Sequence, residues 1–422
     1  MLGGEFFVNL GKMMTQTDDF FEQMTQLFDD SGANLLDEAP YFIGMMSGTS
    51  LDGMDAVLCE FFDDGAPSVI ASHSLPFDDE LRDALLALTA PNGVADYILD
   101  NQLGFESELD VYGWASVYYA NFAAQVVLEL LAKANVSADK VSAIGCHGQT
   151  VRHRPQWSFS LQLLDPNVLA ERTGIAVVSD FRRRDMAVGG QGAPLVPAFH
   201  QAMFGMDDGV KAVLNLGGIA NITVLDHDGT GTPMGFDTGV ANLLMDAWVA
   251  RHTGASYDKD GEMARSGVVI EPLLSLLLSH PFFDKHPPKS TGREEFHLAW
   301  LDEMLGKLNH DHPALRYSPA DVQATLAELT AVSASRDIAR FVKAGSLIVC
   351  GGGALNTHLM ARLQAHLPDL DVINSQQYGV HPTLVEGMAF AWLARQNILG
   401  RAGNVPAVTG ADKAVVLGQV CF

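Results

Sequence analysis

Two glycine-containing turns in this sequence could hold an anion between backbone amide groups. The first lies in GMMSGTSLDGMDAVL, residues 44–58, where an apolar strand gives way to a short polar turn and then resumes. The second, LNLGGIANIT at 214–223, has the same form. One such turn fits an ordinary β-hairpin, because Asp-Gly is a common hairpin sequence. Two of them, at equivalent places in two halves of the chain, favour a pair of hairpins that close on one anion.

A third glycine cluster, VCGGGALN at 349–356, separates a predicted buried strand from a helix. Glycine at this position lets a flat or anionic ligand lie against the backbone at the helix N-terminus. The spacing is not G-x-G-x-x-G, and no acidic residue ends a following strand, so a Rossmann dinucleotide site is disfavoured. A Walker phosphate loop is also absent, since KSTGRE at 289–294 lacks the preceding glycines.

Acidic side chains near these turns are candidates for proton transfer. Asp237, in GFDTGVAN, lies at the predicted end of a strand and just before a helix. An acid at such a point can act as a general base or a metal ligand, and it can equally cap the helix. Asp180 and Asp185, in SDFRRRDMAVGGQGAPL, are alternatives for the same role.

Other polar residues could contact a ligand at the same place. The Arg182–Arg184 run could hold a carboxylate or phosphate group through paired hydrogen bonds, although such a run is more often a solvated surface. His147, in CHGQT, and Glu386, in an apolar helix, are expected at the edge of a cleft. Each of these two residues could also be an ordinary structural polar group.

The elements that must position these residues repeat in two halves. Each half is predicted to begin with a β-hairpin and a third strand, followed by α/β crossover units. These strands are expected at 41–48, 55–62 and 68–75, and again at 212–218, 220–226 and 234–239. A late and unusually apolar helix is expected at 384–396. This pattern predicts two similar α/β domains that face a cleft.

Length and composition exclude several classes of protein. The chain of 422 residues can form two hydrophobic cores. Its net charge of -25 argues against nucleic-acid binding, which needs clustered Lys and Arg. No apolar run reaches about 18 residues, so no membrane span is expected. The cysteines form no CxxC pair, which argues against a local zinc site and favours reduced thiols in the cytoplasm.

The set of motifs resembles the anhydro-N-acetylmuramic acid kinases, a family of the actin/hexokinase/Hsp70 superfamily of two-domain ATP-binding folds. The motifs run in order from Tyr41 to the C-terminus: MSGTSLDGMD, HGQT, DFRRRDMAVGGQGAPLVPAFH, LNLGGIANIT, GFDTG, KSTGREEF, VCGGGALN and VEGMAFAWLA. One departure is Val240-Ala241, where the family usually has Pro followed by Gly or Ala.

This resemblance implies an α/β fold of two actin-like ATPase (ribonuclease H-like) domains that face a central cleft. Domain I is expected over 41–209 and 376–422, and domain II over 210–375. An N-terminal extension is expected over 1–40.

The resemblance also implies which residues bind ATP and Mg²⁺. The expected nucleotide-binding residues form the first phosphate hairpin, the second phosphate hairpin and the adenosine loop: Gly48, Thr49, Ser50, Leu51, Asp52, Gly53, Met54 and Asp55; Gly217, Gly218 and Asn221; and Gly351, Gly352 and Gly353. Asp52 is expected to face Mg²⁺ through water, since Mg²⁺ keeps most of its hydration shell.

The sugar site implied by the resemblance contains Asp237 as the base that activates water. His147, Arg182 and Asn242 are expected to contact the sugar. Glu386 is our candidate for a second carboxylate that orients sugar or water.

The family's reaction couples hydrolysis to phosphoryl transfer. Water opens the 1,6-anhydro bridge of anhydro-N-acetylmuramic acid at C1, and the released O6 accepts the γ-phosphoryl group of ATP. The expected setting is peptidoglycan recycling by a cytoplasmic homodimer with a small-molecule anhydrosugar, without nucleic acid or membrane. Two alternatives stay open: a kinase of another anhydrosugar such as levoglucosan, and a non-catalytic sugar or nucleotide sensor on the same fold.

We predict that residues 1–38 are dispensable. They contain eight acids and one Lys, carry none of the motifs above and fit an added extension, a wrongly assigned start or a cloning remnant better than a functional module. A protein that begins at Ala39 should keep the melting temperature and the activity of the full chain. Loss of either would show that the segment packs on the core.

Overall fold

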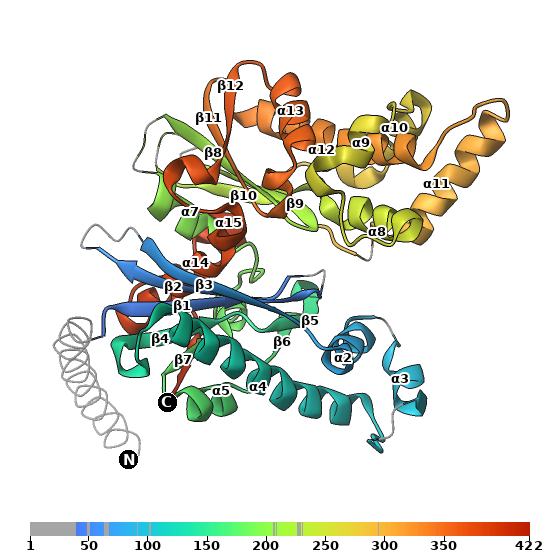
Figure 1. The fold of residues 1–422 in the computed structure, drawn as a ribbon. Coiled ribbons are helices and arrows are strands. Elements are labelled where there is room, and N and C mark those ends of the chain that lie inside the picture. Colours follow the sequence, from blue (N-terminus) through green and yellow to red (C-terminus); the bar gives the residue numbers. More distant parts are fainter. Residues whose placement is uncertain are drawn as a thin grey trace, which may run out of the picture.

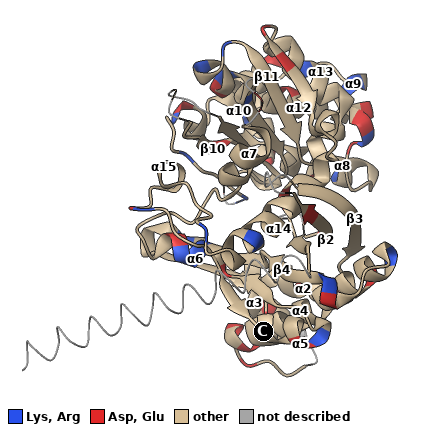
Figure 2. Ribbon diagram, turned by 90° about the vertical axis from the view of Figure 1, so that its left-hand side faces the viewer, with Lys and Arg blue, Asp and Glu red and all other residues tan. Residues whose placement is uncertain are grey.

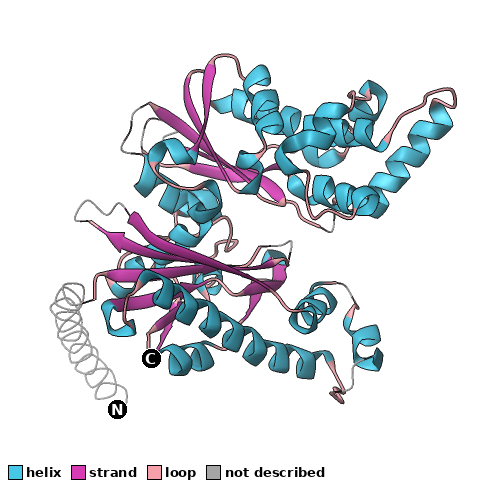
Figure 3. Ribbon diagram, viewed as in Figure 1, coloured by secondary structure: helices cyan, strands magenta, loops and turns pink. Residues whose placement is uncertain are grey.

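The computed structural model describes residues 39–422, except residues 49–50, 63–66, 91, 101–102, 206, 208, 226–228, 230 and 294. The predicted N-terminal extension up to residue 38 therefore lies outside the described residues. Two β-sheets, one above the other in Figure 1, form the centre of the fold, and helices lie against both (Figure 3).

The first sheet has six strands in the order β13-β7-β4-β1-β2-β3. Strands β1, β2 and β3 form an antiparallel meander, β4 and β7 are parallel to β1, and β13 pairs antiparallel with β7 at the edge. Met46 pairs with Asp55, which places residues 47–54 at the tip of the β1–β2 hairpin. The strands are β1 (Tyr41–Met46), β2 (Gly53–Phe61), β3 (Pro67–Pro76), β4 (Val141–Cys146), β7 (Val177–Ser179) and β13 (Gln419–Cys421).

The second sheet repeats this arrangement with five strands in the order β10-β9-β8-β11-β12. Here β8, β9 and β10 form the meander, and β11 and β12 follow in parallel beside β8. The strands are β8 (Val210–Leu216), β9 (Ile219–Val224), β10 (Met234–Val240), β11 (Gly345–Cys350) and β12 (Leu370–Asn374). A meander of three strands followed by parallel strands is the ribonuclease H-like order, so the predicted fold class is confirmed.

Helices cover both faces of the first sheet. Alternate residues of β1 point to opposite faces: Ile43 and Met45 belong to the core that α4 (Glu108–Ala134) covers, and Phe42 belongs to the core beneath α14 (Val385–Ile398). In Figure 1, α14 lies between the two sheets. The other helices around this sheet are α2 (Asp79–Thr89), α3 (Val94–Asp100), α5 (Pro166–Thr173) and α6 (Phe181–Met186). Helices α7 (Val196–Phe204) and α15 (Pro406–Thr409) pack against β10 of the second sheet, at Gly235.

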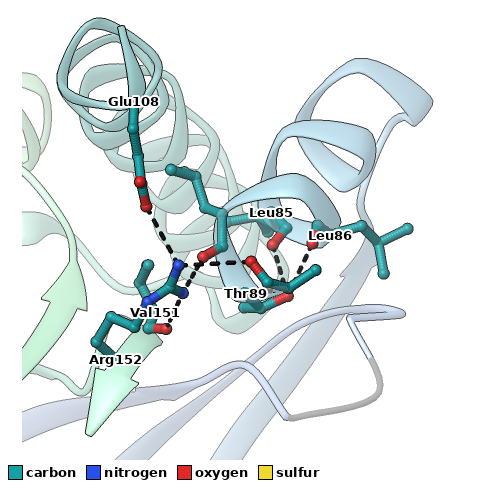
Figure 4. Close-up of polar contacts among 8 residues, drawn as sticks. Leu85, Leu86, Thr89, Glu108, Val151 and Arg152 are labelled. Carbon is teal, nitrogen blue, oxygen red and sulfur yellow. Dashed lines mark hydrogen bonds and ion pairs between the residues drawn. The ribbon is translucent and has the colours of Figure 1, made fainter. Parts of the chain in front are cut away.

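A two-stranded sheet of β5 (Gln149–Arg154) and β6 (Phe159–Leu163) lies beside α2. Arg152 of β5 holds it there, because its guanidinium group donates to the carbonyl of Leu88 in α2 and lies 3.2 Å from a carboxylate oxygen of Glu108 in α4 (Figure 4). Arg152 is thus a structural residue of the first half.

Two helices of the second half have ends that the sequence explains. Helix α12 begins with a capping box of Ser318 and Asp321, with Pro319 at its first position. Helix α8 ends at Gly254, which has a φ of 76°. The helices are α8 (Asn242–Thr253), α9 (Glu262–Ser266), α10 (Glu271–Leu278), α11 (Leu298–Asp311), α12 (Pro319–Phe341) and α13 (Thr357–His366).

Helix α4 is, within the part of the chain that the structure describes, the one helix with the length and composition of a membrane span. More than half of its apolar window, 56%, is buried inside the protein. Its buried residues, among them Tyr119, Ala123 and Val127, belong to the core of the first sheet. The apolar character of α4 is therefore accounted for by packing.

Helix α14 lies directly on the backbone of β1 and β4, and glycines make this possible. A Cβ atom at Gly44 would stand 1.8 Å from the carbonyl oxygen of Gly387, and one at Gly145 would stand 2.0 Å from the carbonyl oxygen of Phe390. Both distances are far below any van der Waals contact, so a side chain at either strand position would push the helix away.

We predict that Gly44→Ala lowers the free energy of unfolding by about 2–4 kcal/mol, because the added methyl group overpacks a contact between two backbones. Chemical denaturation would measure this change. Gly306→Ala is the matched control, since Gly306 is an exposed residue of α11 and a Cβ there meets no atom within 4 Å. The control should be neutral or slightly stabilising. Equal effects at the two positions would contradict the packing argument.

Candidate active site

The tip of the β1–β2 hairpin has an irregular backbone. The N–H group of Leu51 donates to the carbonyl of Gly48 at 3.3 Å, which closes a tight turn. Leu51 has a φ of 59°, which is rare for a branched side chain, and it is buried while Asp52 is exposed. Leu51 thus anchors the turn and Asp52 points to solvent. Thr49 and Ser50, two residues of the predicted phosphate hairpin, lie outside the described residues.

The residues after the turn are tightly packed. A Cβ atom at Gly53 would stand 2.3 Å from the carbonyl oxygen of Leu75 in β3, and Met54 is buried. Asp55 accepts a hydrogen bond of 2.5 Å from the hydroxyl group of Ser74. Burial raises the pKa of Asp55, and the hydrogen bond from Ser74 opposes this change.

The β8–β9 hairpin directs its carbonyl groups toward the start of α8. The carbonyl of Gly217 accepts from the N–H group of Asn242 at 3.0 Å, and the carbonyl of Gly218 accepts from the N–H group of Leu243 at 3.1 Å. In a trans peptide the next N–H points the opposite way, so the amides of Gly218 and Ile219 face away from α8. A Cβ atom at Gly217 would meet no protein atom closer than 3.6 Å.

The third glycine loop, Gly351–Gly353, packs against this hairpin. Gly351 has a φ of 79°, and a Cβ atom on it would stand 2.4 Å from the side-chain oxygen of Asn215. A Cβ atom at Gly352 would have only Asn242 within 4 Å, at 3.8 Å. The side-chain N–H group of Asn242 donates to the carbonyl of Leu216 at 2.9 Å. Asn242, predicted to contact the sugar, therefore lies between the hairpin and the loop.

Asp237 lies in β10 and pairs in register with Asn221 of β9. Its backbone N–H group donates to the carbonyl of Lys289 at 3.0 Å, and its carboxylate oxygen Oδ2 accepts from the N–H group of Thr291 at 3.0 Å. The N-cap of α8 is Ala241, without a side-chain cap. The alternative that Asp237 caps this helix is thus excluded.

The two rival acids have structural partners. Asp180 is paired with Arg183, whose Nε donates to it at 2.7 Å. Asp185 is fully buried and accepts from the side chains of Asn404 and Thr409, each at 2.7 Å, and from the N–H group of Gly192 at 2.8 Å. These contacts account for Asp180 and Asp185 as structural residues. Asp237 therefore remains the candidate base.

The arginine run divides between the interior and the surface. Arg183 and Arg184 are exposed. Arg182 points inward, donating from Nε to Nε2 of His147 at 3.0 Å and from Nη1 to the carbonyl of Gly192 at 2.8 Å. Figure 2 shows these charged positions of α6 below α15.

Arg182 lies close enough to acids from both sheets for their charges to affect its pKa. Burial lowers the pKa of Arg182 to about 10, and the charges of Glu386, Asp185 and Asp237 act against this decrease. Burial, followed by the charge of Arg182, holds the pKa of His147 well below its usual value. His147 is therefore neutral, and because its Nε2 accepts from Arg182 its proton is on Nδ1.

Glu386 is the first-turn acid of α14 and reaches the second sheet. Its carboxylate oxygen Oε1 accepts from the side-chain N–H group of Asn215 in β8 at 3.2 Å. Burial raises the pKa of Glu386; the charge of Arg182 opposes the increase, and the charge of Asp55 adds to it. The structure thus brings Glu386, Arg182 and His147 together.

Three residues of this region were missed by the sequence analysis. Asn215 lies within the LNLGG motif, and Asp246 lies one helical turn after Asn242. Burial, the charge of Asp52 and that of Asp258 raise the pKa of Asp246 to about 7. Burial lowers the pKa of Arg293, and the charge of Asp52 opposes this change. The spacing of Asp246 from Asn242 was a usable signal; the position of Arg293 in a loop gave none.

The described residues contain no cluster of three or more His, Cys, Asp or Glu that could hold a metal ion by itself. An exposed carboxylate such as Asp52 instead fits an ion that arrives with phosphate groups and keeps its water. An open depression of about 550 Å³ on α4, lined by residues such as Gln125, Leu128 and Arg172, includes none of the predicted site residues.

Comparison with known proteins gives consistent results. The chain matches the sequence model of anhydro-N-acetylmuramic acid kinase over residues 40–422. A protein of Psychrobacter cryohalolentis named anhydro-N-acetylmuramic acid kinase is 54% identical over 429 residues, which cover 97% of this chain and 98% of that protein. A protein of the same name from Saccharophagus degradans is 46% identical over 384 residues, 90% of this chain and 98% of that protein.

The Psychrobacter match covers 97% of this chain, which is more than the residues 40–422 matched by the family model. Among solved structures, component A of (R)-2-hydroxyglutaryl-CoA dehydratase from Acidaminococcus fermentans matches 85% of this chain and 99% of its own, with a TM-score of 0.46 and 12% identity. This similarity is too low to bear on function. The family match over residues 40–422 is decisive: the chain belongs to the anhydro-N-acetylmuramic acid kinase family.

Proposed function

We propose that this protein is an ATP-dependent kinase that opens 1,6-anhydro-N-acetylmuramic acid with water and phosphorylates O6, giving N-acetylmuramic acid 6-phosphate in peptidoglycan recycling. The observation that carries this proposal is the family match over residues 40–422. Relatives of the same name at 46–54% identity favour this sugar over levoglucosan. The intact set of glycine turns and Asp237 also disfavour a non-catalytic sensor.

The proposal assigns domain I to residues 41–209 and 376–422 and domain II to residues 210–375. The two sheets fall on either side of these boundaries, which supports the division. One phosphate hairpin then comes from each domain. The amides of Gly218 and Ile219, which face away from α8, are the proposed donors of the second hairpin.

Phosphoryl transfer depends mainly on positioning and charge neutralisation. When bound with ATP, Mg²⁺ supplies positive charge next to the phosphate groups. Asp52 is the residue that would hold this ion, through water, because its carboxylate is exposed at the tip of the first hairpin. The Gly351–Gly353 loop is the proposed adenosine-binding loop. A Cβ atom at Gly352 would have only Asn242 within 4 Å, so the space next to this backbone is available to a ligand.

Ring opening needs a base, and Asp237 is the proposed one. Its carboxylate takes a proton from water as the water oxygen bonds to C1 and the C1–O6 bond breaks. O6 then bonds to the γ-phosphorus, whose bond to the bridging oxygen of ADP breaks. Arg182, held by His147 and the carbonyl of Gly192, is the proposed cation beside the sugar. Glu386 is the proposed second carboxylate that orients sugar or water.

We propose further that the enzyme is a cytoplasmic homodimer. The four cysteines are free thiols in the structure, as expected of a reducing compartment: Cys59, Cys146, Cys350 and Cys421.

Gly217→Val should weaken ATP binding by at least about tenfold, equivalent to about 1.4 kcal/mol. The variant should fold, because the nearest protein atom to the new Cβ is 3.6 Å away, and the loss arises where the side chain blocks phosphate from the amides. Calorimetric titration with ATP would measure it. Gly306→Val, remote from the hairpins, should bind ATP normally. Unchanged ATP affinity in folded Gly217→Val would mean that the hairpin is only structural.

The reaction in ¹⁸O-labelled water should place the label on the C1 hydroxyl group and leave the phosphate ester unlabelled, because the ester contains the sugar's own O6. An ATPase would label inorganic phosphate instead. Asp237→Asn should lower the rate by roughly 10²–10⁴, the usual contribution of a positioned base. Its ATP affinity should be unchanged. Label in the phosphate ester, or near-normal turnover of Asp237→Asn, would reject the proposed mechanism.

A further inference from the structure

A buried ion pair lies next to the segment that contacts Asp237. The ammonium group of Lys289 is 2.7 Å from a carboxylate oxygen of Asp337 in α12, and the two side chains are only 1% and 4% exposed. The same ammonium group lies 4.7 Å from the ring centroid of Phe282. Arg340, one turn further along α12, is 3.3 Å from the other carboxylate oxygen of Asp337.

Stability alone is a weak reason for such a pair. Both ions lose their water on burial, and an apolar pair of similar volume is often at least as stable. Burial raises the pKa of Asp337, and Lys289 and Arg340 oppose this increase. The ion pair instead fixes a position. It holds Lys289, which lies in the loop between α10 and α11, at one point on α12.

The loop fixed in this way contacts Asp237 at two places. The carbonyl of Lys289 accepts from the backbone N–H group of Asp237, and two residues later the N–H group of Thr291 donates to its carboxylate, each at 3.0 Å. On the far side, the hydroxyl group of Thr291 donates to Glu295 at 2.5 Å. The loop therefore fixes the position of the Asp237 backbone and the orientation of its carboxylate.

Strand β10 needs this support. It is the edge strand of its sheet, and its register with β9 shifts between Asp237 and Gly239. At this outer edge the carbonyl of Lys289 accepts one backbone hydrogen bond from Asp237, as a further strand would. Without this segment the carboxylate of Asp237 would also lose the N–H group of Thr291 as a donor.

We propose that the Lys289–Asp337 ion pair is a positioning device for the base of this kinase, acting through residues 289–291. This inference rests on the proposed role of Asp237. The charged group that faces Asp237 from the other half of the chain is Arg182 of α6, and the hydrogen bonds of Arg182 go to His147 and Gly192. Changes at Asp337 therefore leave that cation in place.

Asp337→Asn tests the proposal, with turnover measured as a function of pH in the intact enzyme. We expect kcat to fall at least about tenfold, with the KM for ATP unchanged, because the base is misdirected while the hairpins are intact. The acidic limb of the kcat profile should move up by about one pH unit. A carboxylate that loses an amide hydrogen bond binds its proton more readily and becomes a working base only at higher pH.

Glu328→Gln is the matched control. Glu328 lies on the same helix and pairs with Arg362 of α13 at 2.6 Å, and its side chain is 7% exposed. This variant should lower the melting temperature and leave the acidic limb where it is. An Asp337→Asn enzyme that behaves in the same way, less stable but with normal kcat and pH profile, would overturn the proposal.

If Asp337→Asn does not fold, the double variant Lys289→Met with Asp337→Leu leaves no buried charge unpaired and keeps the test open. The acidic limb of the kcat profile of this double variant should move up as well, because apolar contacts do not replace the ion pair that fixes the loop to α12. An unmoved limb would overturn the proposal. Asp237→Asn distinguishes failure of the proposed base from failure of the positioning role. If Asp237→Asn turns over normally, Asp237 is not the base. If Asp237→Asn is inactive while the double variant has a normal pH profile, only the positioning role of the ion pair is rejected.

Discussion

The direct contact between helix α14 and the backbone of β1 and β4 determines where the two halves of the site meet. At Gly44, Gly145 and Gly387 the lack of a side chain lets the helix and the strands approach each other closely. The residue next to Gly387 is Glu386, so the helix brings this carboxylate close enough to accept from Asn215 of the second sheet. A thicker layer of side chains would change the position of Glu386 relative to Arg182 and to the β8–β9 hairpin.

This packing also concentrates charge in a buried place. Arg182 has acids from three elements around it, Glu386 of α14, Asp185 of its own helix and Asp237 of β10, and burial would otherwise make its charge costly. Each acid gains from the same cation. A site assembled in this way favours the joined arrangement of the two sheets, since separating them would take Asp237 of β10 away from Arg182, while α14 keeps Glu386 on the first sheet.

The sequence predicted the fold class and the glycine turns well, because strands, helices and tight turns leave local patterns. It did not predict which member of the Arg182–Arg184 run is buried, since a run of like residues carries no periodicity. It treated KSTGRE as a failed phosphate loop and as part of a family motif, and assigned no role to Lys289 or Thr291. The contact of Lys289 and Thr291 with Asp237 joins residues that are more than 50 positions apart, and no local pattern reports it. The glycines beneath α14 were missed because glycine within a strand normally indicates a turn or a bulge.

The two carboxylates of the site have different surroundings. The carboxylate of Asp237 receives a hydrogen bond from the N–H group of Thr291, and the charge of Asp237 acts on the buried Arg182. Burial raises the pKa of Glu386, and the charge of Asp55 adds to this increase. These surroundings agree with the proposed roles, in which Asp237 accepts the proton of water and Glu386 orients sugar or water.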